Sequence, residues 1–279
     1  MTFIIGALAF WIGAWWANVV LSARPATLTV RIAVPILFGI TVLVVWEGLV
    51  RGLDVPGVIL PPPTAIAAAF ARSLDILWVD FVQTVLKGAL SGYAIGCGSA
   101  ILTAILIDRS QFLTRGLLPV GNFLAALPIV GTAPIFVMWF GFGWQSKAAV
   151  VVAIVFFPML VNMVQGLAST EPMQRDMMKT YNASYWQTLL KLRLHAAMPF
   201  AFNGLKICTT FALIGAIVAE FFGSPIYGMG FRISTEVGRL ALDVVWAEIA
   251  VAALAGSLFY GLVALSEKRV TFWHPSNRT

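Results

Sequence analysis

The sequence predicts an all-α integral membrane protein, and three observations lead to this fold class. The chain has 279 residues, of which 60% are hydrophobic and only 11% are charged, and its mean hydropathy is +0.91. Soluble globular domains carry about 25% charged residues, so little of this chain can form a soluble domain. Seven apolar segments each approach the ~20 residues that a helix needs to cross a ~30 Å hydrocarbon core. One far more polar stretch, 170–198, separates two of these segments.

The predicted membrane helices follow one another along the whole chain. The first is interpreted as a retained helix, because no basic residue precedes its apolar core and no Ala-x-Ala signal-peptidase site follows it. The seven segments cover residues 3–21, 32–50, 81–107, 118–140, 147–166, 198–222 and 244–266.

A helix at the membrane surface is predicted after the second segment. The run Pro61-Pro62-Pro63 forms a stiff turn, and Thr64 is the expected N-cap of a helix over 65–77.

The third segment carries a stripe of small residues at a spacing of four. Such a stripe lets helix backbones approach closely, so a helix-packing face is expected, with a pore-lining strip as the alternative. The stripe consists of Gly88, Gly92, Gly96, Ala100 and Ala104.

The fourth segment is interrupted by Pro128 and Pro134, each of which removes a helical hydrogen bond. Broken helices at membrane depth are tolerated where they are buried or line a cavity, which makes the two prolines candidates for a transport pathway. The alternative is an ordinary kink packed against neighbouring helices. Asn162 in the fifth segment is a further pathway candidate.

The sixth segment contains two charged residues, Lys206 and Glu220. Fourteen helical residues separate them by about 21 Å, so they cannot pair along the helix. A charge at the bilayer centre costs about 2.5–3.5 kcal/mol, and each is expected near an end or facing protein or water. Glu220 is a candidate gate residue, and a structural hydrogen-bonding role is the alternative.

The first half of the polar stretch is predicted to be a short helix. Thr170 is its expected N-cap, and Pro172 lies in the first turn, where a missing N–H costs nothing. Methionine-rich faces suit adaptable protein contacts. At 100° per residue, one face of this helix carries Met173, Met177, Met178 and Tyr181.

A second helix follows this first one. Asn182 can adopt a left-handed conformation and so end the first helix, and Ser184 can cap the second. The stretch 170–198 is therefore predicted to be a helix–turn–helix that offers methionines and aromatics to a partner outside the membrane.

The basic residues predict the orientation of the chain. If the polar stretch lies in the cytoplasm, eleven Lys and Arg residues fall inside and five outside, with Lys87 and Lys206 within segments. This asymmetry agrees with the positive-inside rule and puts the N-terminus outside and the C-terminus inside. Because the basic residues are scattered at segment ends, they indicate topology and no nucleic-acid partner.

The sequence offers no catalytic or metal site. Cys97 and Cys208 both lie in apolar stretches, so neither a disulfide nor a metal site is expected. The chain has no Gly-x-x-x-x-Gly-Lys-[Ser/Thr] motif and cannot cradle ATP phosphates in a P-loop. It is therefore predicted not to be an enzyme by itself and to carry no cofactor.

The polar stretch resembles the cytoplasmic "EAA" loop of binding-protein-dependent ABC importer permeases. Asp176-Met177-Met178 stands where that family has Glu-Ala-Ala, Asn182-Ala183-Ser184 stands for Gly-Ala-Ser, and His195 replaces a proline. The acid, the turn former and the spacing are kept. Other family motifs occur in the same order over about 42–270: Trp-Glu at 46–47, Leu-Pro-x-Pro at 60–63, prolines at 128 and 134, Trp-Phe-Gly-x-Gly at 139–143, Phe-Phe-Pro at 156–158, Ala-Glu at 219–220 and Gly-x-Gly at 228–230.

The resemblance implies a type I ABC importer permease in a bacterial cytoplasmic (inner) membrane. Two copies, expected to be a homodimer surrounded by lipid, would form the translocation pathway. A soluble binding protein would deliver substrate, and ATPase subunits, which hold the ATP and Mg²⁺, would dock on the coupling loop. The resemblance assigns this docking to Met173, Asp176, Met177, Met178, Tyr181, Asn182, Ala183 and Ser184.

Related permeases usually have six membrane helices, so residues 1–30 are expected to be an additional N-terminal helix. Residues 31–279 would then form the permease domain, with the coupling loop at 170–198. A secondary transporter or channel is the alternative class, although no convincing internal repeat is visible.

The expected substrate is a small polar nutrient, with a pyrimidine or thiamine precursor or a riboflavin-type compound as the specific prediction. The pathway helices offer amides, a hydroxyl and aromatics without a run of arginines, which suits a small, polar or aromatic solute better than a strong anion. These polar side chains are Asn122, Thr132, Asn162 and Gln165. A permease for taurine, alkanesulfonates or nitrate is the alternative.

Overall fold

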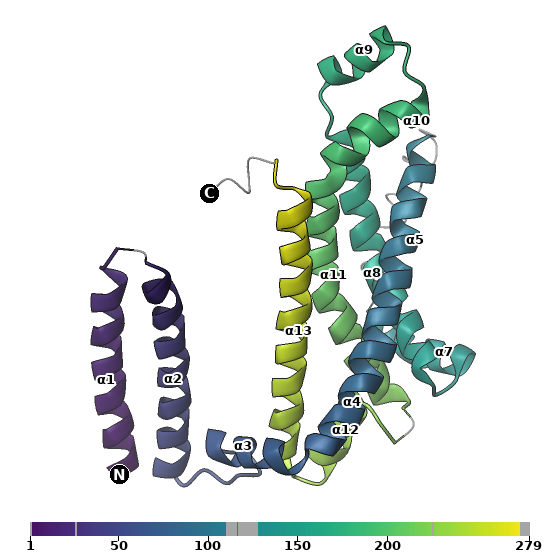
Figure 1. The fold of residues 1–279 in the computed structure, drawn as a ribbon. Coiled ribbons are helices and arrows are strands. Elements are labelled where there is room, and N and C mark those ends of the chain that lie inside the picture. Colours follow the sequence, from purple (N-terminus) through teal and green to yellow (C-terminus); the bar gives the residue numbers. More distant parts are fainter. Residues whose placement is uncertain (1, 26, 110–115, 117–127, 225, 274–279) are drawn as a thin grey trace. The chain divides into compact units, whose positions relative to one another are not determined.

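The computed structural model describes residues 2–25, 27–109, 116, 128–224 and 226–273, and every regular element in these ranges is a helix (Figure 1). This confirms the predicted all-α fold. The elements are α1 (Thr2–Ser22), α2 (Leu28–Gly52), α3 (Pro63–Arg72), α4 (Leu74–Phe81), the π-helical turn η1 (Val82–Ala89), α5 (Leu90–Asp108), α7 (Ile129–Phe140), α8 (Trp144–Ala168), α9 (Pro172–Thr180), α10 (Tyr185–Thr188), the π-helical turn η2 (Leu189–Arg193), α11 (Leu194–Phe222), α12 (Met229–Gly238) and α13 (Leu242–Val270).

In the described ranges, six helical segments are long and apolar enough to cross a membrane. Each matches one of the seven predicted segments. Two begin well before the predicted start, at Leu74 and Tyr185, because α4 and η1 run on into α5, and α10 and η2 run on into α11. The remaining predicted segment, 118–140, is described only from Pro128, where α7 contributes 12 helical residues; 118–127 lie outside the described residues.

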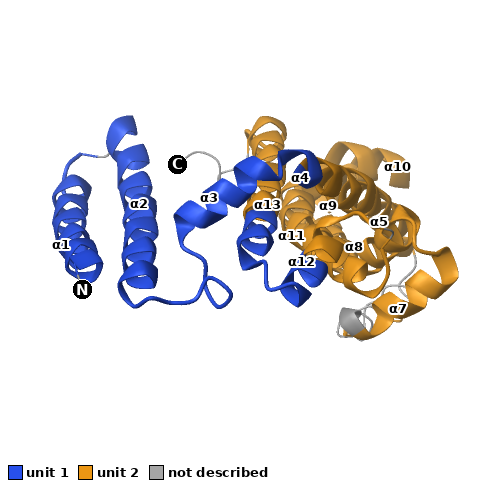
Figure 2. Cartoon of the chain, turned by 90° about the horizontal axis from the view of Figure 1, so that it is seen from below, with its two compact units in different colours: residues 1–77, 233–249 blue, residues 78–232, 250–279 orange. Residues whose placement is uncertain are grey.

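The chain divides into two compact units, coloured separately in Figure 2. Unit 1 contains residues 1–77 and 233–249, and unit 2 contains 78–232 and 250–279. The predicted division at residue 30 stays a prediction, since α1 and α2 both belong to unit 1.

In unit 1, α1 and α2 pack as a close antiparallel pair. A Cβ on Gly48 would meet the Cβ of Ala7, and one on Gly52 would meet the side chain of Ile4, so both glycines are needed for this approach. Large apolar side chains such as Ile12 and Trp16 are exposed on the outer face of α1. This surface fits a helix that faces lipid.

Unit 1 also contains a polar contact between α2 and α3. Thr64 donates its backbone N–H to Glu47 Oε2 at 3.0 Å and its hydroxyl to Oε1 at 2.7 Å, and Arg51 pairs with the same carboxylate. The prediction that Thr64 is an N-cap was wrong. Proline at the first helical position is preorganised for a helix start, so α3 begins at Pro63 and the threonine hydroxyl is used for the contact with α2.

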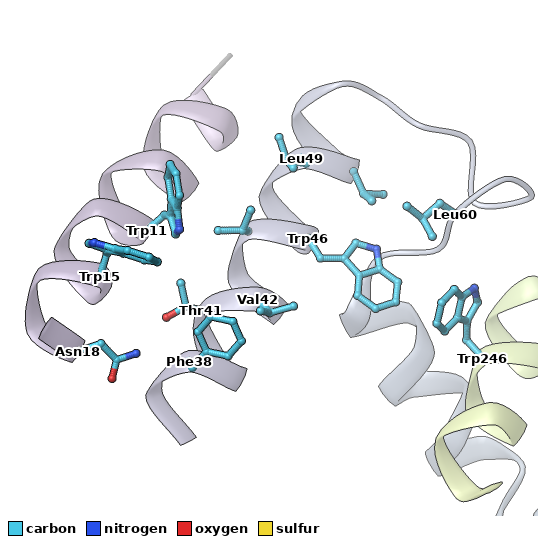
Figure 3. A pocket seen from close by; sticks show the side chains of 12 residues that line it. Trp11, Trp15, Asn18, Phe38, Thr41, Val42, Trp46, Leu49, Leu60 and Trp246 are labelled. Carbon is cyan, nitrogen blue, oxygen red and sulfur yellow. The ribbon is translucent and has the colours of Figure 1, made fainter. Parts of the chain in front are cut away.

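A cavity of about 590 Å³ lies in unit 1 and is lined mainly by aromatic and aliphatic side chains (Figure 3). Trp46 packs edge-on against Trp246, with 5.0 Å between ring centroids, while Trp11 and Asn18 line the part formed by α1.

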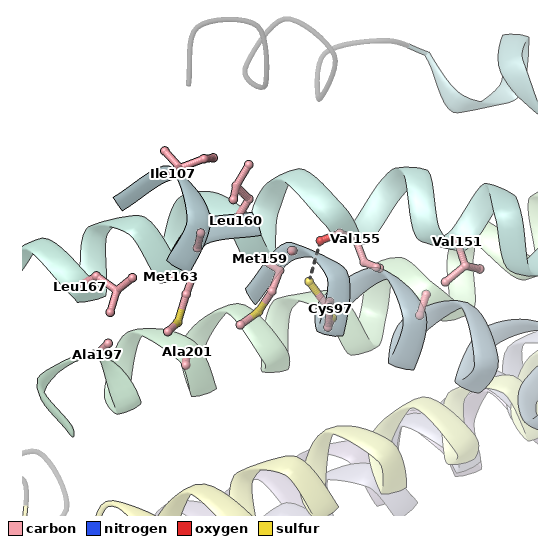
Figure 4. Packing of buried hydrophobic residues seen from close by; sticks show 14 of the residues in the cluster. Cys97, Ile107, Val151, Val155, Met159, Leu160, Met163, Leu167, Ala197 and Ala201 are labelled. Carbon is pink, nitrogen blue, oxygen red and sulfur yellow. Dashed lines mark hydrogen bonds between the residues drawn. The ribbon is translucent and has the colours of Figure 1, made fainter. Parts of the chain in front are cut away.

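In unit 2, α5, α8 and α11 enclose the main apolar core (Figure 4). A Cβ on Gly92 would meet Val151 and the carbonyl of Ala148, and one on Gly96 would meet Val155. The glycine stripe is therefore a packing face against α8, which confirms the first of the two predicted readings. Cys208, a buried free thiol, donates to the carbonyl oxygen of Val155 at 3.4 Å in this core.

Candidate functional site

The predicted helix–turn–helix is present as α9 and α10, at the end of unit 2 where α5 terminates (Figure 1). The prediction that Thr170 is the N-cap was wrong: Glu171 takes this position, and its N–H donates to Gln174 Oε1 at 3.2 Å. The reason is that Pro172 is the first helical residue, so the cap must be the residue directly before it. Thr170 is buried instead.

The turn between the two helices is formed as predicted. Asn182 has a φ of +51°, in the left-handed region, and its N–H donates to the carbonyl of Lys179 at 2.8 Å. Ser184 caps α10 in a reciprocal pair with Gln187: the Gln187 N–H donates to Ser184 Oγ at 3.3 Å, and the Ser184 N–H donates to Gln187 Oε1 at 2.8 Å. We call α9, this turn and α10 the hairpin.

The hairpin exposes an apolar surface. Met173 is 80% and Tyr181 77% exposed, and Met177 is also exposed, all at a spacing of four residues. We call these three side chains the apolar face of α9. Met178 and Ala183 are half-buried. Exposed methionines and an aromatic at helical spacing form a surface that can adapt to a protein partner.

Asp176 lies on α9 and takes part in a local ion pair. Lys179 donates to Asp176 Oδ1 at 2.8 Å, and this hydrogen bond and the positive charge of Lys179 lower the pKa of Asp176 from its ordinary value. Both side chains are exposed, so the pair keeps a charged patch beside the apolar face.

At the base of the hairpin, Arg193 makes a bidentate ion pair with Asp108 that was not predicted from the sequence. We call this ion pair the fork. The two terminal nitrogens of Arg193 donate to the two oxygens of Asp108, each at 2.6 Å, and its Nε donates to the carbonyl of Leu167 at 3.0 Å. The hydroxyl of Tyr185 also donates to Asp108, at 2.9 Å. In the sequence, this ion pair is indicated only by an aspartate directly after an apolar segment, because its partner Arg193 is 85 residues away.

The membrane-embedded candidates do not form one site. Asn162 on α8 donates to the carbonyl of Pro158 at 2.8 Å and accepts from Asn203 Nδ2 at 3.0 Å. Asn203 and Glu220 are 17 residues apart on α11, about 25 Å along the helix, so these polar groups lie at different depths.

The two prolines lie on or beside α7. Pro128 is at its N-cap and is exposed, and Pro134 is inside the helix. Next to Pro134, Ala133 packs against Val150 of α8 and Ala219 of α11. Asn122 lies outside the described residues.

Glu220 belongs to a buried cluster that binds the start of α12. Three successive backbone N–H groups, those of residues 228–230, each donate to a different buried side chain. The acceptors are, in order, Asp80 Oδ1 at 2.6 Å, Thr84 Oγ1 at 2.8 Å and Glu220 Oε2 at 2.8 Å. The Thr84 hydroxyl in turn donates to Glu220 at 2.9 Å. This geometry supports the structural alternative for Glu220.

Two cations, the half-buried Arg232 and the buried Lys147, complete this cluster. Arg232 Nε donates to Asp80 Oδ2 at 2.9 Å. Lys147, only 1% exposed, donates to the carbonyl of Phe142 at 2.8 Å and to that of Gly223, the C-cap of α11. A buried charge is tolerated when it is paired and hydrogen-bonded, and a cation is favourable at a helix C-terminus. The cluster therefore fastens Gly223 to α8, and residues 228–230 to α4, η1 and α11.

Comparisons with known proteins agree with these features. Residues 92–272 match the family described as "Binding-protein-dependent transport system inner membrane component". A probable ABC transporter permease protein of Haemophilus influenzae is 32% identical over 79% of this chain and 89% of its own length. The riboflavin transport system permease protein RibX of Chloroflexus aurantiacus is 30% identical over 84% of this chain and 87% of its own length. The formylaminopyrimidine transport permease protein ThiX of Halalkalibacterium halodurans is 29% identical over 86% of this chain and 95% of its own length.

Proposed function

We propose that the hairpin docks on an ATPase subunit, because the chain belongs to the binding-protein-dependent transport system inner membrane components. It is a permease of the ABC importer type. The observation that carries this proposal is the apolar face of α9, which is exposed and lies between two candidate membrane spans, outside both. Family membership removes the alternative of a self-sufficient secondary transporter or channel.

The hairpin is suited to transmit motion. Its helices are held by a left-handed turn and a capping pair, so α9 and α10 keep a fixed geometry when pushed. Closure of the ATPase pair on ATP would move the docked hairpin as a lever, and the permease would change between inward- and outward-facing states by rigid-body movement. ATP and Mg²⁺ are held by the ATPase in this scheme.

The assembly contains two copies of this chain and a soluble binding protein that meets them on the outer side. The eleven-to-five distribution of basic residues supports a cytoplasmic hairpin, an outer N-terminus and a cytoplasmic C-terminus. Residues 1–30 add one helix to the permease domain.

The substrate class proposed is a pyrimidine or thiamine precursor or a riboflavin-type compound. Support comes from two relatives with coverage above four fifths of this chain, which are named for riboflavin and for formylaminopyrimidine transport. The Asn162–Asn203 pair on α8 and α11 offers neutral hydrogen-bonding groups, which suit such a solute better than a strong anion. Taurine, alkanesulfonates and nitrate are the alternative substrates.

Substitution of Ala183 tests the docking proposal. Ala183 is half-buried in the turn, so Ala183→Arg places a charge beside the apolar face and should abolish co-purification of the ATPase while the permease still inserts in the membrane. Ala68→Arg makes the same change at an exposed position of α3 and serves as the control. If Ala183→Arg keeps the ATPase bound with normal transport, the docking assignment is wrong.

A further inference from the structure

Arg193 joins three parts of unit 2 at the base of the hairpin. It is the last residue of η2, Asp108 is the last residue of α5, and Leu167 lies in the last turn of α8. The side chains of Arg193 and Asp108 are only 16% and 14% exposed. One guanidinium group therefore fixes the ends of two membrane helices to the segment that carries the hairpin.

The two contacts differ in chemistry, and the contact with Asp108 needs the planar guanidinium of an arginine. The parallel pair of N–H···O bonds to Asp108 fixes both distance and orientation, which a lysine ammonium cannot do. The carbonyl of Leu167 is among the last four of α8, which have no partner inside the helix, and Arg193 supplies both a donor and a positive charge there.

The connection between the hairpin and α5 is made by side chains. The chain itself joins the hairpin to α8 through residues 169–171 and to α11 through η2, whereas α5 has no neighbouring chain connection to it. The side-chain hydrogen bonds of α9 found in the described ranges are local, such as those of Asp176 and Gln174. Links from the hairpin segment to the end of α5 come from Arg193 and Tyr185, both at Asp108, and from Arg109, the C-cap of α5, whose guanidinium lies 5.1 Å from the centre of the Tyr185 ring and 5.7 Å from that of Trp186. Of these contacts, the two parallel hydrogen bonds of Arg193 fix both distance and orientation.

We propose that Arg193 is a positioning residue that makes α5 and α8 follow the hairpin when the ATPase moves it. This inference rests on the proposed docking function. With the fork intact, the hairpin and the ends of α5 and α8 move as one body. Without it, the hairpin moves on its docked ATPase while α5 stays behind, so ATP binding no longer reaches the packed core of α5, α8 and α11.

Distance measurement between spin labels tests this directly, without knowledge of the substrate. Labels are placed at Leu106→Cys on α5 and Lys179→Cys on α9, both exposed and both outside the apolar face; the native Cys97 and Cys208 are buried. The permease–ATPase complex is measured by pulsed electron paramagnetic resonance with and without ATP and orthovanadate. With Arg193 present, the 106–179 distance should be narrow and the same in both states.

In Arg193→Lys the same distance should shift and broaden when ATP and vanadate are added, and only then. Arg175→Lys makes the same chemical change on α9 and should behave like the unsubstituted protein. A narrow, unshifted distance in Arg193→Lys with ATP and vanadate would overturn the proposal. So would broadening that is already complete without nucleotide, because Arg193 would then only hold the fold. Co-purification of the ATPase with the unsubstituted permease is scored separately, and its absence would refute the docking function instead.

Discussion

Glu220 accepts a hydrogen bond from the backbone N–H of Gly230, ten residues further along the chain, at 2.8 Å. The same carboxylate accepts a hydrogen bond from the hydroxyl of Thr84, and the Glu220 side chain is buried, with only 1% of the residue exposed. An acid in a membrane helix is thus used to hold the start of α12 onto α11 and η1. An acid in this structural role only has to accept hydrogen bonds, whereas an acid in a gate must ionise or bind a passing solute.

Substitution of Glu220 distinguishes these two roles. Glu220→Gln keeps an acceptor oxygen and should retain transport and most of the thermal stability. Glu220→Ala leaves the Gly230 N–H without its buried acceptor, which costs about 1–3 kcal/mol per group, and should lower the unfolding temperature of the purified permease. Loss of transport in Glu220→Gln at unchanged stability would instead favour a gate that needs the acid itself.

The packing of α5 on α8 can be tested with two glycines of the same helix. A side chain at Gly92 would collide with Val151 and the backbone of Ala148, whereas a Cβ at Gly98 meets nothing within 4 Å. Gly92→Leu should therefore destabilise the protein by about 1–3 kcal/mol through overpacking, and Gly98→Leu should be neutral. Thermal unfolding in detergent measures both. Equal stability of the two variants would contradict the observed interface.

Reporter fusions test the proposed topology. A reporter active only in the cytoplasm should be active when fused at Thr279 and inactive when fused at the N-terminus, as the eleven-to-five distribution of basic residues predicts. Activity at both ends, or at neither, would rule out an odd number of spans and so the extra helix, whereas activity at the N-terminus alone would reverse the orientation.

The substrate proposal is checked on the partner binding protein. Calorimetric titration with a formylaminopyrimidine, riboflavin, taurine and nitrate should give tight binding for one of the first two. Tight binding of taurine or nitrate alone would exclude the vitamin-precursor class.

Local features of the hairpin could be predicted from the sequence because their causes lie within a few residues. Asn182 ends a helix through its own backbone preference, and Ser184 caps the next one three residues from its partner Gln187. The N-cap of α9 was misplaced by one residue, since both Thr170 and Glu171 can cap and only the position of Pro172 decides between them.

Long-range polar contacts could not be predicted in the same way. Arg193 and Asp108 are 85 residues apart, and Arg232 and Asp80 are 152 residues apart. A single sequence shows that each is charged but gives no pairing, because the pairing depends on how the helices pack. The spacing of Gly92 and Gly96 predicted a packing face, and the structure identifies α8 as the helix packed against it.

Site-specific crosslinking from the apolar face of α9 tests the central claim most directly. A photo-reactive amino acid is introduced at Met177 of the hairpin or, as a control, at Met138 of α7; both positions are exposed. Illumination of membranes that contain the complete importer should give an ATPase adduct from position 177 and none from position 138. An ATPase adduct from position 138 alone, or an adduct of position 177 with the binding protein, would contradict the account.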